Sequence, residues 1–451
     1  MKDLTQGSIF RHLVSMALPI TIGMLLQTLY YIVDLYFVAQ LGDAAIAGVG
    51  AAGNVMFVIF ALTQMVGVGN MALMSHAVGR QNQKDANHVF NQSVALTAVC
   101  AVLTLAAGYG LAVAYMDLLG ADTATRSAGV TYLYWFTPGL ALQFAMVAMG
   151  SALRGTGIVK PGMVVQALTV VLNAILAPIL IAGWGTGHAL GVAGAGLASS
   201  LAIAVGVAMM SFYFLKLETY VGFDRRHWRP QLATWLRMLN IGLPAGGEFA
   251  LLAVFTGIVY WIIRDFGAAA QAGFGIGTRV MQSIFLPAMA IAFAAAPIAG
   301  QNFGARQAGR VRETFGSSAV AGSAIMAVLT LLCQWQSDWL IRIFTNDAEV
   351  VRVGAQYLQV LSWNFVAIGL VFTCSSMFQA LGNTWPSLIS TASRLVVFAV
   401  LAIWVSKRPG FALVHVWYVS VVTTTLQAVL SLLLLRSQLK GRLKFSGAAA
   451  A

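Results

Sequence analysis

Long runs of apolar residues, separated by short polar connections, dominate the chain. The runs extend for about twenty residues or more without the period-two alternation of membrane strands, so they predict transmembrane helices rather than a β-barrel. We expect twelve helices. Their ranges are 12–41, 46–76, 88–116, 126–154, 160–183, 191–216, 233–265, 270–303, 314–344, 351–381, 385–406 and 411–437.

The composition agrees with a polytopic membrane protein. Of 451 residues, 59% are hydrophobic and only 9% are charged, whereas about a quarter of the residues in soluble domains are charged. The net charge of +12 could indicate nucleic-acid binding in a soluble chain. Here the basic residues lie in connections between apolar runs, so we expect the lipid bilayer as a partner and no nucleic acid.

The positions of the basic residues predict the orientation. The connections after even-numbered helices are basic and so are both tails, whereas those after odd-numbered helices carry few Lys or Arg, apart from Lys407 and Arg408. By the positive-inside rule, both termini are expected in the cytoplasm. The start, "MKDLTQGSIFRHL", lacks the apolar core and small-residue cleavage site of a signal peptide. We therefore expect a multi-pass membrane protein.

An internal repeat links the two halves of the chain. The longest polar connection, 217–231, separates two sets of six helices, and several landmarks of the first half recur in the second at one constant offset. Six is an even number, so the repeats are parallel, an arrangement typical of transporters. We expect an N-terminal lobe, 1–216, a cytoplasmic linker, 217–232, and a C-terminal lobe, 233–451. The matching landmarks include Leu18-Pro19 with Leu243-Pro244, Gly42 with Gly267, and "AGVG" at 47–50 with "AGFG" at 272–275.

Only two of the 14 acidic residues lie well inside apolar helices, Asp34 and Glu248. An ionised carboxylate at the centre of a membrane helix costs ~2.5–3.5 kcal/mol on insertion scales, so such residues usually serve ion or substrate pathways. Burial in a low-dielectric wall disfavours the charged form. Asp34 is therefore expected to bind and release a proton, and Glu248, which follows two glycines, is a second candidate.

Other polar side chains are candidates for the same sites. Tyr31, Tyr30 and Gln27 precede Asp34 on one helix face. Asn173 is a plausible neighbour of Asp34, although it could simply join two helices, and Ser199 and Ser200 could simply allow close packing. The two tyrosines could equally be packing residues. The candidates for a substrate cavity are Tyr30, Gln143, Asn364, Arg279 and Arg394; Arg394 could instead have a structural or snorkelling role.

Signals for enzymatic chemistry are absent from the sequence. It contains no G-x-S-x-G, H-E-x-x-H or Walker A motif, and its three cysteines are isolated, without metal or disulfide spacing. We therefore expect neither an enzyme nor a bound cofactor or metal. Without a nucleotide-binding loop, transport would be driven by an ion gradient, of protons or possibly sodium.

Several segments resemble the multidrug and toxic compound extrusion (MATE) family, and in particular its DinF-like branch. The resemblance covers nearly the whole chain and implies two six-helix lobes around a central cavity, with substrate leaving as a proton or sodium ion enters. The segments that carry it are "ALPITIGMLLQTLYYIVDLYFVAQLG", "ALRGTG", "GVAGAGLASSLA" and "AAPIAGQNFGARQAGRVRE".

The resemblance implies a cation site in the first lobe. Asp34 and Asn173 match the family's aspartate in helix 1 and asparagine in helix 5, and Ser199 occupies a position where the DinF-like branch often has threonine. Ala177 stands where many relatives have a second aspartate, which favours protons over sodium. Glu248 lies about one turn earlier than the helix-7 glutamate of other branches.

The helix-10 aspartate of the NorM-like branch has no counterpart here. Asn364 is the nearest polar residue within 351–381. This absence weakens the prediction of a sodium site in the second lobe.

The sequence and this resemblance together predict a monomeric, cation-coupled antiporter of a bacterial inner membrane, with the proton as the expected ion. It would export amphiphilic and often cationic small organic compounds. Two alternatives remain open: a flippase or exporter of a lipid-linked or polar biosynthetic product, and a sodium-coupled drug antiporter. A membrane-embedded enzyme would need a catalytic cluster of His, Ser or acidic residues that the sequence does not show.

Overall fold

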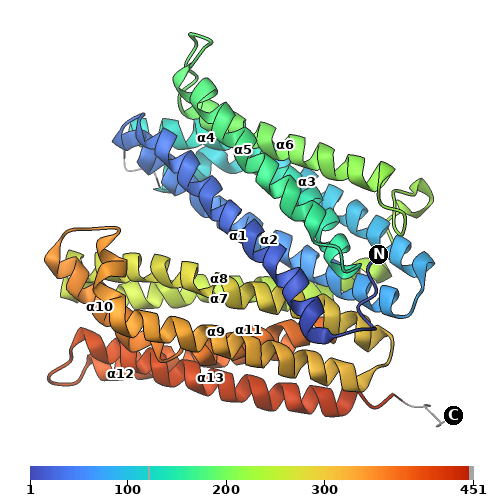
Figure 1. Ribbon diagram of the computed structural model, residues 1–451. Helices are drawn as coiled ribbons and strands as arrows, with labels where there is room; N and C mark the ends of the chain where they lie inside the picture. The colour runs from blue at the N-terminus through green and yellow to red at the C-terminus, as the bar shows by residue number, and fades with distance from the viewer. Residues whose placement is uncertain (120–121, 446–451) are drawn as a thin grey trace. The chain divides into compact units, whose positions relative to one another are not determined.

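The computed structural model describes residues 1–119 and 122–445, apart from the side chain of Tyr31. Every regular element in these residues is helical (Figure 1), as the apolar pattern predicts. Eleven helices are long and apolar enough to cross a membrane, and one bent pair brings the number to twelve. The helices are α1 (Ile9–Ala39), α2 (Asp43–Gly79), α3 (Gln83–Leu119), α4 (Thr123–Gly155), α5 (Lys160–Ala182), α6 (Val192–Lys216), η1 (Arg225–His227), α7 (Leu232–Ile263), η2 (Arg264–Phe266), α8 (Ala268–Gly304), α9 (Ala308–Arg342), α10 (Ala348–Ser362), α11 (Phe365–Ala380), α12 (Trp385–Ser406) and α13 (Leu413–Arg442).

The bent pair corrects one prediction. A continuous helix was expected over 351–381, but α10 and α11 meet at an angle of 60°. Asn364, at the break, donates a hydrogen bond to the carbonyl of Ser420 in α13 at 3.3 Å, and its own oxygen accepts one from Thr425 at 3.4 Å. These contacts fix the break to α13, so Asn364 has a structural role at this position.

The backbone itself repeats along the chain. Gly42 and Gly267, which precede α2 and α8, have φ of 100° and 87°, a region that favours glycine because it has no Cβ. Gln81 and Arg306 share the left-handed region at 56° and 59°. Both pairs have the offset of the sequence landmarks, which confirms the parallel repeat. Two more pairs have the same offset: Gly157 with Gly382, and Gly185 with Gly410.

Contacts divide the chain into two compact units. The first contains Met1–Asp3 and Pro19–Leu243, and the second contains Leu4–Leu18 and the chain from Pro244 onward. The early parts of α1 and α7 therefore pack in the opposite unit from the rest of the same helix. A proline marks each change of unit, where the missing N–H permits a bend. The predicted division into 1–216, 217–232 and 233–451 follows chain order and stays a prediction.

The segment before Pro19 is held in the second unit by hydrogen bonds from the end of α8 and the start of α9. The amide of Leu4 donates to Gln301 Oε1 at 3.0 Å, and Asn302 Nδ2 donates to the carbonyl of Leu4 at 3.1 Å. Arg310 donates to Asn302 Oδ1 and to the carbonyl of Gly7, both at 2.9 Å. The "GQNFGARQAGR" stretch therefore anchors the beginning of the chain.

The connection between α6 and α7 is docked on α3 within the first unit. Gln92 Nε2 donates to the carbonyls of His227 and Arg229 at 2.6 and 2.8 Å, and Gln92 Oε1 accepts from the amide of Gln231 at 2.9 Å. Asn91, the preceding residue, bonds to Gly222 and other groups of the same segment. Two buried amide side chains thus satisfy much of the linker backbone.

Two helix-start carboxylates outside the membrane spans are stabilised in their charged form. The amide of Thr125 donates to Asp122 at 2.7 Å at the start of α4, and this bond lowers the pKa of Asp122. The amide of Arg226 donates to Asp224 at 3.0 Å at the start of η1, and this bond lowers the pKa of Asp224. Both groups therefore remain ionised at neutral pH.

Each unit has its own core. In the first unit α4 packs against α2, α3 and α6, and in the second α8 packs against α9, α10 and α11. Phe274 of α8 stacks on Trp417 of α13, with ring centroids 5.7 Å apart, and Tyr357 of α10 meets both rings edge to face.

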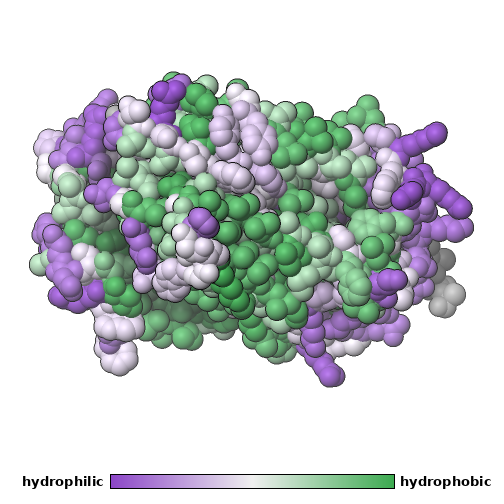
Figure 2. All heavy atoms as spheres, turned by 90° about the horizontal axis from the view of Figure 1, so that it is seen from above, coloured by the Kyte–Doolittle hydropathy of each residue, from purple (hydrophilic) through white to green (hydrophobic). Residues whose placement is uncertain are grey.

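Many large hydrophobic side chains are also exposed on the surface. Figure 2 shows hydrophobic side chains over the middle of one face and hydrophilic ones gathered toward both ends.

Candidate functional site

Three helices of the first unit bring predicted site residues together. Asp34 and Tyr30 lie one turn apart on α1, Asn173 is in the middle of α5, and Ser199 is in the first half of α6. All four side chains are buried; Asn173 is 0% exposed and Asp34 is 9% exposed. These positions are far apart in the sequence, so their meeting is produced by the packing of α1, α5 and α6 in this unit.

A hydrogen-bond network joins the four residues. Asn173 Nδ2 donates to the Tyr30 hydroxyl and to Ser199 Oγ, both at 3.3 Å. The Ser199 hydroxyl in turn hydrogen-bonds to the carboxyl group of Asp34. Ser199 is therefore the link between the carboxyl group and the amide.

Two acceptor atoms in this cluster are left over. Asp34 Oδ1 and Asn173 Oδ1 are both buried, and neither has a hydrogen-bond partner among the described residues. An unsatisfied buried acceptor costs roughly 1–3 kcal/mol. A proton on Asp34 would add a donor to a site that has an acceptor to spare.

The cluster has one carboxylate. Ala177 lies one turn beyond Asn173 on α5 and is fully buried, so a methyl group faces the packing at this position. Across residues 1–119 and 122–445, no group of three or more His, Cys, Asp or Glu side chains is placed to hold a metal ion.

The remaining candidates of the first unit lie on α1, α4 and α6. Gln27 lies two turns before Asp34 on α1 and is half-buried, and Gln143 is half-buried in α4. The side chain of Tyr31 lies outside the described residues. Ser200, adjacent to Ser199, donates to the carbonyl of Trp135 in α4 at 2.7 Å. Ser200 therefore joins α6 to α4, on a different face from the cluster.

A second carboxyl group inside the membrane spans belongs to the second unit. Glu248 of α7 hydrogen-bonds to Ser387 of α12, and its Oε1 is buried without a partner among the described residues. The preceding Gly247 faces Leu388, which a Cβ would approach to 3.2 Å. The glycine therefore lets α12 lie close to this part of α7.

A cation lies further along the same pair of helices. Arg394, near the middle of α12, sits over the ring of Phe255 of α7, 4.5 Å from its centroid. Its Nε is buried without a hydrogen-bond partner, and the described residues provide no carboxylate in ion-pair contact with it. Arg279 on α8, in contrast, is exposed. Both arginines were predicted to line a substrate cavity. Arg394 packs between α7 and α12, whereas Arg279 is exposed.

Sequence reasoning missed the residues that surround these two groups. Ser387 precedes Arg394 by seven residues, and Phe255 follows Glu248 by seven. A spacing of seven places two residues on the same helix face, and this signal could have linked the four positions.

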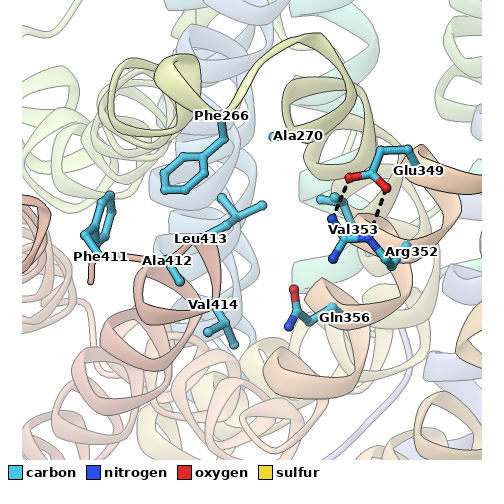
Figure 3. A pocket seen from close by; sticks show the side chains of 10 residues that line it. All are labelled: Phe266, Ala270, Glu349, Arg352, Val353, Gln356, Phe411, Ala412, Leu413 and Val414. Atoms are coloured by element: carbon cyan, nitrogen blue, oxygen red, sulfur yellow. Dashed lines mark hydrogen bonds and ion pairs between the residues drawn. The ribbon is translucent and has the colours of Figure 1, made fainter. Parts of the chain in front are cut away.

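A separate cavity of about 330 Å³ lies where α10 and α13 begin. Figure 3 shows aromatic and aliphatic side chains, including Phe266 and Leu413, on one side and the Glu349–Arg352 pair on the other. The charges of this pair already satisfy each other. Neither Glu248 nor Arg394 lines the cavity, so it is distinct from the candidate sites.

Curated relatives match most of the chain. The multidrug export protein MepA of Staphylococcus haemolyticus is 26% identical over 97% of this chain and 95% of its own length. A protein of Shewanella oneidensis named FAD transporter is 24% identical over 88% of each chain. The fold also matches solved structures. A MOP superfamily transporter from Pyrococcus furiosus superposes with a TM-score of 0.91 and 23% identity over 98% of both chains.

The family profile shows the same duplication as the structure. The MatE model matches residues 19–179 and 244–404, two segments of equal length whose starts and ends have the offset of the sequence landmarks. The matched segments start at the prolines where α1 and α7 change unit. Together with the candidate spans and the repeated backbone, this match shows that the chain belongs to the MatE family, the multidrug and toxic compound extrusion transporters.

Proposed function

We propose that this protein is a proton-coupled antiporter that exports amphiphilic organic compounds, with Asp34 as the coupling residue. The observation that carries this proposal is the enclosed cluster of Asp34, Tyr30, Asn173 and Ser199, in which two buried acceptor oxygens lack partners among the described residues. When a carboxyl group in such a site binds or releases a proton, its hydrogen bonds change, because the group gains or loses a donor.

The two protonation states would favour different arrangements of α1. When Asp34 is ionised, it accepts a hydrogen bond from Ser199. When it is protonated, its hydroxyl group can donate to a free acceptor such as Asn173 Oδ1. A proton and a substrate that favour different arrangements are thereby coupled, because each shifts the equilibrium that the other uses.

Sodium is the alternative coupling ion. The same two oxygens could contribute to a sodium site, but sodium prefers several hard oxygen ligands, and Ala177 offers none. The single carboxylate therefore favours the proton. Assignment to the DinF-like branch rests on the same residues and is part of this proposal.

The relatives named for multidrug export and for FAD transport support small organic molecules as substrates. Their bacterial sources support a bacterial inner membrane as the location. We expect transport by alternating access in a monomer, with both termini in the cytoplasm.

Efflux from proteoliposomes with imposed gradients tests the proposal. We expect wild-type protein to move rhodamine 6G when a proton gradient is imposed and not when only a sodium gradient is imposed. Asp34→Asn should reduce this transport to the level of empty liposomes while keeping a monodisperse peak in detergent. Asp43→Asn, at the exposed start of α2, is the matched control and should transport normally. Active accumulation by Asp34→Asn would refute the coupling role.

A further inference from the structure

Arg394 of the second unit has no countercharge among the residues that the structure describes. It lies in the middle of α12, a span of 22 residues. Charged side chains at this depth are usually paired or face a functional pathway. No carboxylate of the described residues pairs with Arg394, and its buried Nε has no hydrogen-bond partner among them. The proton site described above does not use this residue.

The nearby carboxyl group does not neutralise it. Glu248 contacts Ser387, whereas Phe255 contacts Arg394. Phe255 lies seven residues after Glu248 on α7, and Arg394 lies seven residues after Ser387 on α12. Glu248 and Arg394 are therefore separated by about two turns, or about 10 Å along the helices. The seam between α7 and α12 therefore holds two opposite charges that do not meet.

The contacts of the guanidinium group occupy its face but leave its Nε without a hydrogen-bond partner among the described residues. Phe255 covers its face, and Phe255 is in turn fixed against Phe398, with centroids 4.7 Å apart. Tyr357, which also interacts electrostatically with Arg394, shares a hydrogen bond with Thr278 at 3.4 Å. A planar guanidinium whose face is occupied presents its N–H groups in a fork that suits a carboxylate or phosphate.

We propose that Arg394 binds the anionic group of an amphiphilic substrate, such as a carboxylate, so that the protein exports organic anions as well as uncharged or cationic compounds. This inference rests on the proposed export function and deepens it by naming a substrate class. The substrate's apolar part would lie along the membrane-embedded seam, and its anionic group would supply the missing countercharge.

Binding of two matched fluorescent probes tests this proposal. Dansylglycine carries a carboxylate, and dansylglycinamide has the same ring system without the charge. With purified full-length protein in dodecyl maltoside, we expect wild type to bind the acid about tenfold or more tightly than the amide, as a charge-assisted hydrogen bond predicts. Equal affinities for the two probes would overturn the proposal, and this comparison needs no variant.

Variants locate the effect. Arg394→Gln should abolish the preference for the acid, and Arg394→Lys should retain part of it because the charge stays while the fork is lost. Arg408→Gln is the matched control, since Arg408 also covers a ring of α12, that of Trp404 at 4.2 Å, but lies beyond the end of the helix. A preference that persists in Arg394→Gln, or that disappears in Arg408→Gln, would contradict the assignment.

Two further measurements distinguish a substrate site from a lipid site and from a failure of export. Added phosphatidylglycerol should leave dansylglycine bound; its displacement would assign Arg394 to a lipid and overturn the substrate site. Rhodamine 6G efflux by the same wild-type preparation reports on the export function independently. Normal efflux without an acid preference refutes the anion site alone, whereas an acid preference without any efflux supports the site and contradicts the export function.

Discussion

At the scale of single residues, Asn173 and Asn70 form a natural comparison. Both are fully buried asparagines that donate two hydrogen bonds while their own Oδ1 has no partner among the described residues. Asn70 connects α2 to α4, whereas Asn173 belongs to the Asp34 cluster. Their structural situations match, so a difference between their variants isolates the contribution of the cluster.

We predict that Asn173→Ala changes the free energy of unfolding by no more than about 1–2 kcal/mol, because lost hydrogen bonds are offset by removal of an unsatisfied acceptor. Gradient-driven transport should nevertheless fall severely. Asn70→Ala should have a similar effect on stability and little effect on transport. Thermal unfolding and proteoliposome efflux measure the two effects, and equal transport by both variants would argue against a special role for Asn173.

Sequence reasoning could identify Asp34 and Asn173 because polar side chains inside apolar helices are rare. It could not decide between neighbouring residues such as Ser199 and Ser200. Adjacent positions on a helix are about 100° apart, so the choice depends on which face meets α5. The structure turns Ser199 toward Asn173 and Ser200 toward the α4 backbone.

At the scale of elements, the contact between α5 and α6 positions two members of the cluster. Gly194, near the start of α6, lies directly against the carbonyl of Leu180 in α5, and a Cβ there would overlap with that backbone. The close approach of these helices thus depends on the absence of a side chain at Gly194.

Gly194→Ala should destabilise the protein by about 1–3 kcal/mol, the usual cost of overpacking, and should also reduce transport. Gly53→Ala is the control, since a Cβ at this helical position meets nothing within 4 Å; alanine there should be neutral or stabilise the helix by up to about 1 kcal/mol. Thermal unfolding and efflux measure both variants. A neutral Gly194→Ala variant would show that α5 and α6 can separate without loss.

The docked linker gives a second prediction for an element. Gln92→Ala removes three hydrogen bonds to the backbone of residues 227–231. Trypsin should then cleave the Arg-rich linker several-fold faster than in wild type. Lys84→Gln, an exposed change on the same helix, should leave the rate at the linker unaltered. An unchanged rate in Gln92→Ala would mean that other contacts, such as those of Asn91, suffice.

The break between α10 and α11 shows where element boundaries escape a sequence pattern. Neither Trp363 nor Asn364 is a proline or glycine, and apolar residues resume directly after them. The bend of 60° accompanies hydrogen bonds between Asn364 and α13. Such tertiary contacts override local helix propensity and have no local signature.

At the scale of the whole molecule, membrane orientation can be tested with introduced cysteines. Cys333 and Cys374 are buried and Cys100 is half-buried, so wild type should react weakly with a membrane-impermeant maleimide. With both termini in the cytoplasm, His188→Cys should be labelled in intact spheroplasts, and Lys84→Cys only after permeabilisation. The reverse pattern would invert the predicted topology.

The number of helices and their duplication were readable from the sequence because both repeat as simple patterns: apolar runs of membrane length, and landmarks that recur at one constant offset. The packing of the first parts of α1 and α7 in opposite units was not. The apolar pattern of a helix is the same whichever neighbouring helix covers it, so the pattern cannot show in which unit a segment packs. Chain order alone therefore led to predicted lobes that each contain the whole of their first helix.

This exchange of helix segments has a consequence for ancestry. Reciprocal exchange of one equivalent element is how two copies of a chain form a domain-swapped dimer. Leu4–Leu18 and the part of α7 before Pro244 are such equivalent elements, each built into the other copy's unit. The chain thus has the architecture of a swapped homodimer whose two copies became fused. Each unit needs a segment from the other half of the chain: the first unit contains the start of α7, and the second contains Leu4–Leu18. Neither copy of the repeat therefore forms a complete unit by itself.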